Sequence, residues 1–131
     1  MTFWGGIEAG GTKFVVGICD HEGTVQDRKI IQTGKPGETV EKVTAYFHSR
    51  SEDYPLDGIG LATFGPLDLD RSSDTYGSIT STPKEHWRNF NIKEAFEETL
   101  HRQIPFDTDV NAAVLAEHLW GAARAKQNAV Y

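Results

Sequence analysis

Apolar and polar residues recur along the first third of the chain in an order that predicts three strands. Apolar residues run through about residues 2–8 and again through 13–19, with a pair of glycines between the two runs. This pattern predicts two strands joined by a tight turn. A polar Asp20–Gly23 loop precedes a third extended run over about 25–33, so the three strands are expected to form an antiparallel meander.

The period then changes to that of a helix. Val40, Val43 and Phe47 fall on one face of a helix expected over about 38–50, because residues three and four apart share a helix face. A short apolar strand is expected over about 56–64. Trp87 follows in an irregular stretch and is interpreted as a packing residue rather than a ligand contact, although an aromatic ring near a sugar is also useful for stacking against its C–H faces.

The last third of the chain predicts two more helices and two strands. Asn91, followed by Glu94 three residues later, is typical of a capping box, and Ile92, Phe96 and Leu100 then lie one turn apart. A strand-like run follows over about 104–109, then an alanine-rich helix over about 110–123, and a strand begins at 129–131.

A helix between two strands forces a crossover, so the later strands are expected to run parallel. The sequence therefore predicts an α/β fold with a mixed sheet, a three-strand antiparallel meander followed by β/α crossovers, of the ribonuclease-H-like (actin-like ATPase) type. In such sheets ligands collect at the carboxyl ends of the strands. The first, fourth and fifth strands are expected to be neighbours, which would bring their polar ends together.

Composition and charge narrow the class of partner. The 131 residues suffice for one domain, and the net charge of −6 argues against binding to nucleic acid or to an anionic membrane. No apolar run approaches a membrane span of about 20 residues, and the start shows no signal-peptide pattern. The single cysteine, Cys19, permits no internal disulfide and is expected to be a buried free thiol. A cytoplasmic protein fits these features.

The turn between the first two strands carries the strongest chemical signal. Gly10 and Gly11 are expected to adopt positive φ and to leave backbone N–H groups open to a phosphate. Thr12 and Lys13 add a hydroxyl and a cation there, and Glu8 stands where a metal that accompanies the phosphate would need an oxygen ligand. An ordinary hairpin with surface charges explains the same residues.

Two other polar stretches have competing interpretations. Asp109 follows the fifth expected strand and either acts as a catalytic carboxylate or caps the alanine-rich helix behind it. The aspartates at 68, 70 and 74 suggest a calcium loop, but their spacing lacks the glycine and glutamate of an EF-hand. A solvated loop is therefore expected there.

Taken together, these stretches resemble the ROK family of sugar kinases, and most closely its fructokinase branch. The resemblance covers nearly the whole chain and rests on ordered motifs: Glu8-Ala9-Gly10-Gly11-Thr12-Lys13-Phe14, Gly60 to Asp68, Tyr76 to Lys84 with Trp87, Thr108 to Ala113, and Trp120-Gly121-Ala122-Ala123. It favours the functional interpretation of the first turn and of Asp109.

The resemblance implies phosphoryl transfer from ATP, with Mg²⁺, to a hexose hydroxyl, and here D-fructose to fructose 6-phosphate. Asp109 matches the general base. The first phosphate motif corresponds to Glu8, Gly10, Gly11, Thr12 and Lys13. The wall of the sugar pocket corresponds to Gly65, Ser81, Thr82 and Thr108. Many members have Asp where Glu8 stands, a difference of one methylene that would shift the metal. Many have Asn where Thr108 stands, and replacing that amide ligand with a hydroxyl leaves the identity of the sugar open.

Family members have two lobes, and residues 1–131 correspond to the N-terminal lobe. The second phosphate loop and the family's zinc site would lie in the second lobe, which is absent from this chain, and no metal ligands are assigned here. The chain alone is expected to be inactive and the full-length protein to be a homodimer. Alternatives are a sugar-responsive ROK-type regulator, a non-catalytic sugar-binding module, or a kinase for another hexose.

Overall fold

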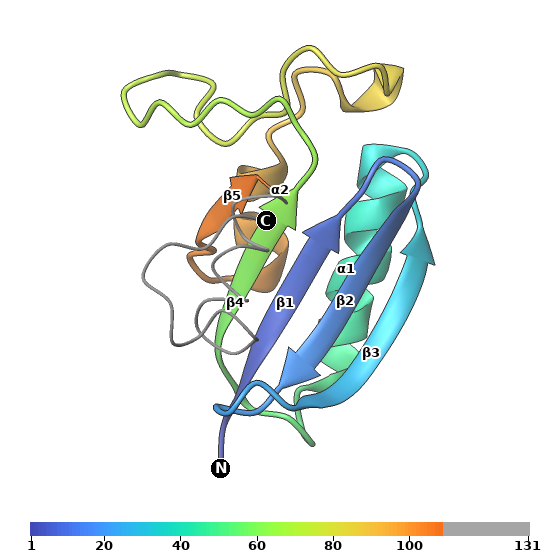
Figure 1. Ribbon diagram of the computed structural model, residues 1–131, viewed down its shortest axis with the longest axis vertical. Coiled ribbons are helices and arrows are strands. Elements are labelled where there is room, and N and C mark those ends of the chain that lie inside the picture. The colour runs from blue at the N-terminus through green and yellow to red at the C-terminus, as the bar shows by residue number, and fades with distance from the viewer. Residues whose placement is uncertain (109–131) are drawn as a thin grey trace, which may run out of the picture.

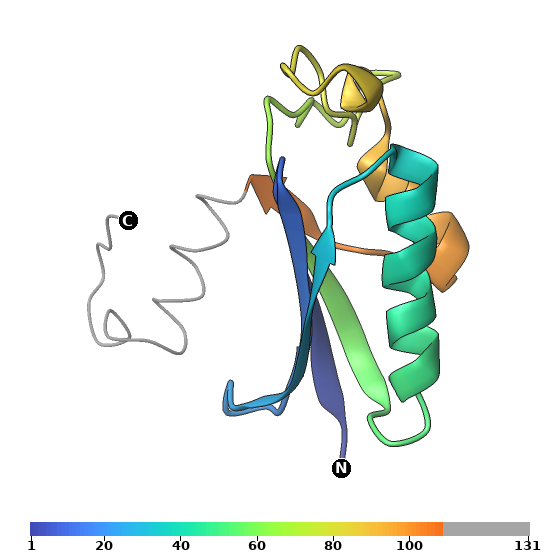
Figure 2. The same cartoon turned by 90° about the vertical axis from the view of Figure 1, so that its right-hand side faces the viewer.

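The computed structural model describes residues 1–108, which form one mixed sheet with two α-helices packed on one of its faces (Figures 1 and 2). The strands are β1 (Phe3–Ala9), β2 (Lys13–Cys19), β3 (Val25–Gln32), β4 (Leu56–Thr63) and β5 (Phe106–Thr108). The helices are α1 (Pro36–Arg50), α2 (Ile92–Leu100) and the short 3₁₀ helix η1 (Glu85–Trp87).

The strand order is β3-β2-β1-β4-β5. The pairs β1–β2 and β2–β3 are antiparallel, whereas β1–β4 and β4–β5 are parallel. The predicted meander and crossovers are therefore confirmed, and so is the expectation that the first, fourth and fifth strands are neighbours. The carboxyl ends of β1, β4 and β5 consequently meet at one edge of the sheet.

The elements form close to where the sequence predicts them. Helix α1 begins at Pro36, two residues before its predicted start, because proline's fixed φ suits the first helical turn. Helix α2 begins after Asn91, whose side chain accepts a hydrogen bond from the Glu94 N–H at 2.9 Å. The predicted capping residue is thus confirmed. The helix expected over 110–123 and the strand expected at 129–131 lie outside the described residues.

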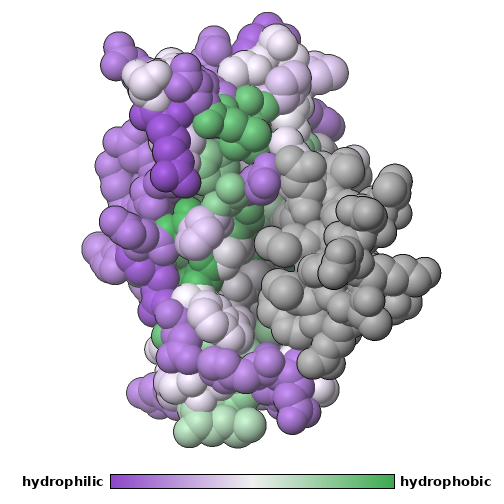
Figure 3. All heavy atoms as spheres, turned by 60° about the vertical axis from the view of Figure 1, so that its left-hand side comes forward, coloured by the Kyte–Doolittle hydropathy of each residue, from purple (hydrophilic) through white to green (hydrophobic). Residues whose placement is uncertain are grey.

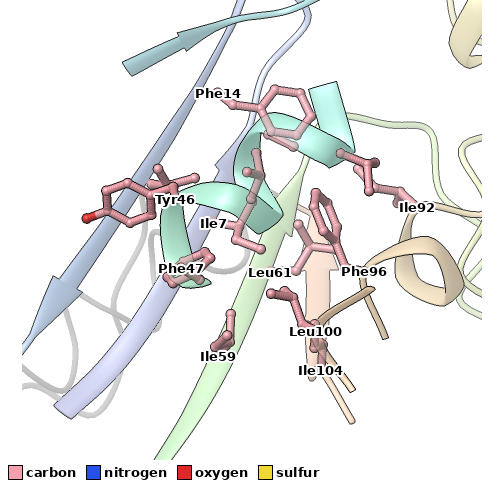
Figure 4. Packing of buried hydrophobic residues seen from close by; sticks show 14 of the residues in the cluster. Ile7, Phe14, Tyr46, Phe47, Ile59, Leu61, Ile92, Phe96, Leu100 and Ile104 are labelled. Carbon is pink, nitrogen blue, oxygen red and sulfur yellow. The ribbon is translucent and has the colours of Figure 1, made fainter. Parts of the chain in front are cut away.

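The hydrophobic core lies between the sheet and the two helices (Figure 4). Along β1, every second residue from Phe3 to Ala9 is buried toward this core, while the residues between them are exposed on the other face. Phe14 of β2 and Phe96 of α2 are completely buried. Each such side chain stabilises the fold by roughly 1.5–3 kcal/mol, so the core holds the strand ends in place.

The described residues on the face drawn in Figure 3 are mostly polar at its margins, and apolar side chains gather in a strip through the middle. No helix of residues 1–108 is both long enough and apolar enough to cross a membrane. Cys19 is a free thiol, but it is half-buried rather than buried as expected. It ends β2 on the face opposite the buried Ile18. Burial and the nearby Asp20 carboxylate raise the pKa of its thiol.

Candidate functional site

The candidate site is built on a row of residues that crosses the carboxyl ends of three strands. Thr63 of β4 is paired in register with Ala9 of β1 on one side and with Thr108 of β5 on the other. The Gly10–Thr12 turn follows Ala9 directly, so it lies at the same edge of the sheet as Thr108. Ala9 and Thr108 are two strand spacings apart, roughly 10 Å. This edge is where a mixed sheet offers a ligand site.

Hydrogen bonds hold the turn after β1 in one conformation. The Gly10 N–H donates to the Lys13 carbonyl at 3.0 Å. Thr33, just after β3, donates its hydroxyl to the Gly10 carbonyl at 2.8 Å and its N–H to the Thr12 carbonyl at 3.0 Å. The carbonyls of the turn are thus engaged by the neighbouring strand, which fixes the direction of the remaining N–H groups.

The expectation of positive φ at Gly10 and Gly11 is wrong, because the glycines with positive φ in the described chain are Gly23 and Gly77. Close approach, rather than φ, requires glycine at position 10. A Cβ placed on Gly10 would lie 2.7 Å from the Lys13 carbonyl oxygen, much closer than van der Waals contact. The turn is therefore tight because its two sides touch through the backbone.

The turn presents donors that no other described residue uses. Within residues 1–108 the N–H groups of Gly11 and Thr12 have no hydrogen-bond acceptor. The Thr12 and Lys13 side chains are exposed. Neither Lys13 nor the exposed Glu8 forms an ion pair in the described chain. Open N–H groups beside a hydroxyl and a cation suit a phosphate, so the structure brings together the predicted first phosphate motif.

The four predicted sugar-pocket residues occupy different settings. Gly65 follows the end of β4 and is joined to Pro66 by a cis peptide bond, and Thr108 ends β5 at the same edge. Ser81 is exposed in the loop after β4. Thr82 is buried, and its hydroxyl accepts a hydrogen bond from the Lys84 N–H at 3.2 Å. Sugar contact by these residues stays a prediction.

Asp109, the predicted catalytic base, lies outside the described residues, and its role stays a prediction. Thr108, which immediately precedes it, is the last described residue. Within the described range no three His, Cys, Asp or Glu side chains are grouped so that they could hold a metal ion.

The loop after β4 uses its aspartates on its own backbone and hydroxyls. Asp68 accepts hydrogen bonds from the Ser73 and Thr75 hydroxyls, and these bonds lower the pKa of its carboxyl group. Asp70 accepts from the N–H and the hydroxyl of Ser72. These contacts agree with the expected polar loop.

Trp87 anchors this loop over the strand ends. Its ring is 2% exposed and packs against Phe14, Phe64 and Phe90. Its indole N–H donates to the Gly34 carbonyl at 2.9 Å. The interpretation of Trp87 as a packing residue is confirmed. Since Phe14 is the second residue of β2, directly after the phosphate turn, Trp87 links the loop to the candidate site.

Replacing Trp87 with Phe should destabilise the protein by about 1–3 kcal/mol, because the hydrogen bond from the indole N–H to the Gly34 carbonyl would be lost and a smaller ring would leave part of the buried space unfilled. Denaturant unfolding measures this change. The exposed His86→Phe is the control and should leave the unfolding free energy within about 0.5 kcal/mol. An unchanged midpoint for Trp87→Phe would contradict the anchoring role.

The sequence did not reveal two residues that shape the turn. Thr33 fixes the turn through its two hydrogen bonds. The sequence feature that could have indicated this role is its place at the end of the third predicted strand. Lys84 lies against Gly11, where a Cβ would meet the Lys84 Cε at 3.3 Å. No spacing pattern joins positions 11 and 84, so only the fold shows this contact.

A mixed sheet in this order, with an open glycine turn after its first strand, defines an actin-like ATPase fold. The ROK family model matches residues 4–131, and the chain belongs to the ROK family. The family resemblance seen in the motifs is thereby confirmed.

The chain is similar to several proteins named as sugar kinases. A putative fructokinase of Bacillus subtilis is 44% identical over 127 residues, which are 97% of this chain and 41% of that protein. A Lactococcus lactis fructokinase is 44% identical over 115 residues, 88% of this chain and 38% of that protein. The solved ROK hexokinase of Thermus thermophilus superposes with a TM-score of 0.77 at 29% identity, covering 95% of this chain and 41% of that structure. The chain thus spans about two fifths of the length of these relatives.

Proposed function

We propose that this chain is the N-terminal lobe of a two-lobed, ATP-dependent hexose kinase, in which it supplies the first phosphate motif and the catalytic base. The observation that carries the proposal is the pair of unpartnered N–H groups at Gly11 and Thr12 within the described residues. They lie at the edge where β1, β4 and β5 end. The match to relatives named as fructokinases supports the same activity.

The residues of the turn have distinct roles in this proposal. The Gly11 and Thr12 N–H groups and the Lys13 ammonium bind phosphate oxygens of ATP and offset their negative charge. The exposed Glu8 carboxylate fits Mg²⁺, because that ion keeps several waters and takes only one or two protein carboxylates. When bound with ATP, the metal would neutralise charge on the phosphates.

Asp109 takes the proton from the attacking sugar hydroxyl. A carboxylate is a suitable acceptor because it need only remove one proton as the hydroxyl attacks the phosphorus in line. Gly65, Ser81, Thr82 and Thr108 form the wall that holds the sugar. We propose D-fructose as the substrate and fructose 6-phosphate as the product, on the basis of the 44% identical relatives named as fructokinases.

The chain alone should not turn over substrate, because phosphoryl transfer depends on positioning by both sides of the phosphate site. We further propose that the two-lobed protein acts in the cytoplasm as a homodimer and binds neither nucleic acid nor membrane. The net charge of −6 supports the last point.

A coupled assay of the two-lobed protein with ATP, Mg²⁺ and a panel of hexoses tests the proposal. The expected result is ATP-dependent phosphorylation, with kcat/KM highest for fructose among fructose, glucose, mannose and N-acetylhexosamines. Phosphorylation of another hexose at a higher kcat/KM would correct the substrate. No phosphorylation of any sugar, combined with sugar-dependent DNA binding in a shift assay, would replace the kinase by a regulator.

A further inference from the structure

Lys84 brings a further cation to the phosphate turn. A Cβ built on Gly11 would lie 3.3 Å from Cε and 3.7 Å from Cγ of Lys84, so the lysine's aliphatic chain lies directly over the turn. The ammonium nitrogen is bonded to this Cε. Figure 1 shows the yellow loop that carries η1 above the β1–β2 turn, and Lys84 directly precedes η1.

The backbone of Lys84 is held in place from several sides. Its N–H donates to the buried Thr82 hydroxyl at 3.2 Å, and its carbonyl accepts from the Trp87 N–H at 2.9 Å. Trp87 in turn is fixed to the Gly34 carbonyl and to the aromatic cluster behind the turn. The loop therefore presents the lysine to Gly11 from a rigid base rather than from a free end.

The charges around the turn are not balanced within the described chain. Lys84 and Lys13 are both exposed, and neither forms an ion pair with a residue of the 1–108 range. Lys13 precedes the buried Phe14, so it points to the sheet face opposite the core, whereas Lys84 reaches the turn from the loop. An anion bound at Gly11 and Thr12 would be attracted by both cations.

We propose that Lys84 is a phosphate-binding residue, whose ammonium contacts the same phosphoryl group as the Gly11 and Thr12 N–H groups. This inference rests on the proposed kinase function of the turn. The phosphoryl group belongs either to ATP or to the hexose phosphate product, and both present the same anionic oxygens. Because the Lys84 side chain lies over Gly11, a side chain at position 11 would displace the Lys84 ammonium group.

Steady-state kinetics of the two-lobed protein with Lys84→Met, Lys84→Arg and the control Lys42→Met test the inference. Methionine keeps an apolar stem over Gly11 but removes the charge, and Lys42 is an exposed lysine of α1. A lost charge-assisted hydrogen bond predicts about a tenfold or greater rise in KM for ATP in Lys84→Met, with the hexose KM unchanged. Arginine should restore most of the affinity, and Lys42→Met should match the parent.

The pattern of change identifies the source of the phosphate. A rise in KM for ATP assigns Lys84 to the nucleotide, whereas weaker product inhibition by the hexose phosphate at unchanged KM for ATP assigns it to the product. A change of less than about twofold in both the KM for ATP and product inhibition would overturn the inference. So would a fall in thermal stability in which the KM values for ATP and hexose rise equally.

Direct binding separates this inference from the proposed function. ATP and inorganic phosphate are titrated calorimetrically into the parent protein and into Lys84→Met. If the parent phosphorylates no hexose yet binds these probes about tenfold more tightly than Lys84→Met, the inference stands and the kinase proposal fails. If the parent is an active kinase and the two proteins bind the probes equally, the inference fails and the kinase proposal stands.

Discussion

Replacing Asp109 with Asn in the two-lobed protein should lower kcat for hexose phosphorylation by about 10²–10⁴-fold. The amide has nearly the same shape as the carboxylate, but it cannot take the proton from the sugar hydroxyl. Binding does not require the proton transfer, so KM values for ATP and hexose should change by less than about threefold. Initial rates over a range of both substrates measure this split.

Asp53→Asn makes the same chemical change at an exposed position after α1, far from the strand ends, and should leave the rate unchanged. Asp109 also has the alternative role of a helix N-cap. Because Asn caps a helix about as well as Asp does, a capping role predicts near-parental kcat for Asp109→Asn. That outcome would remove Asp109 from the chemistry.

Replacing Gly10 with Ala should disrupt the phosphate turn. The new Cβ would lie 2.7 Å from the Lys13 carbonyl oxygen, a backbone atom that cannot move aside independently. The turn must open, which weakens the Gly10–Lys13 hydrogen bond and displaces the Gly11 and Thr12 N–H groups. We expect a loss of about 1–3 kcal/mol in unfolding free energy and at least about a tenfold rise in KM for ATP.

Gly37→Ala is the matched control, because no atom lies within 4 Å of a Cβ placed on Gly37 in the first turn of α1. Alanine favours the helix, so this variant should be up to about 1 kcal/mol more stable and kinetically unchanged. Denaturant unfolding and ATP kinetics on both variants give the comparison. Equal stability and equal ATP affinity of Gly10→Ala and the parent would contradict the tight-turn account.

Much of the fold could be predicted because its signals are local. The 13–19 strand shows the apolar run of β2, and Asn91 with Glu94 marks the start of α2. The parallel direction of β4 and β5 followed from one physical rule, that a helix between two strands makes a parallel crossover. These features need only neighbours in sequence, so residue periodicity was sufficient to find them.

The details of the site depended on contacts between distant positions. Position 10 requires glycine because a Cβ there would meet the Lys13 carbonyl across the turn. The residue type alone suggested a different reason, positive φ, which is wrong. Thr33 and Lys84 reach the turn from other elements. Side chains brought together by the fold leave no pattern along one sequence, so the structure was needed to show them.

The most direct test is a crystal structure of the two-lobed protein with a non-hydrolysable ATP analogue and fructose. The account predicts phosphate oxygens about 2.7–3.2 Å from the backbone nitrogens of Gly11 and Thr12, with the Asp109 carboxylate facing the sugar hydroxyl across the strand ends. Phosphates bound away from this turn, or Asp109 on the opposite side of the sheet, would contradict it.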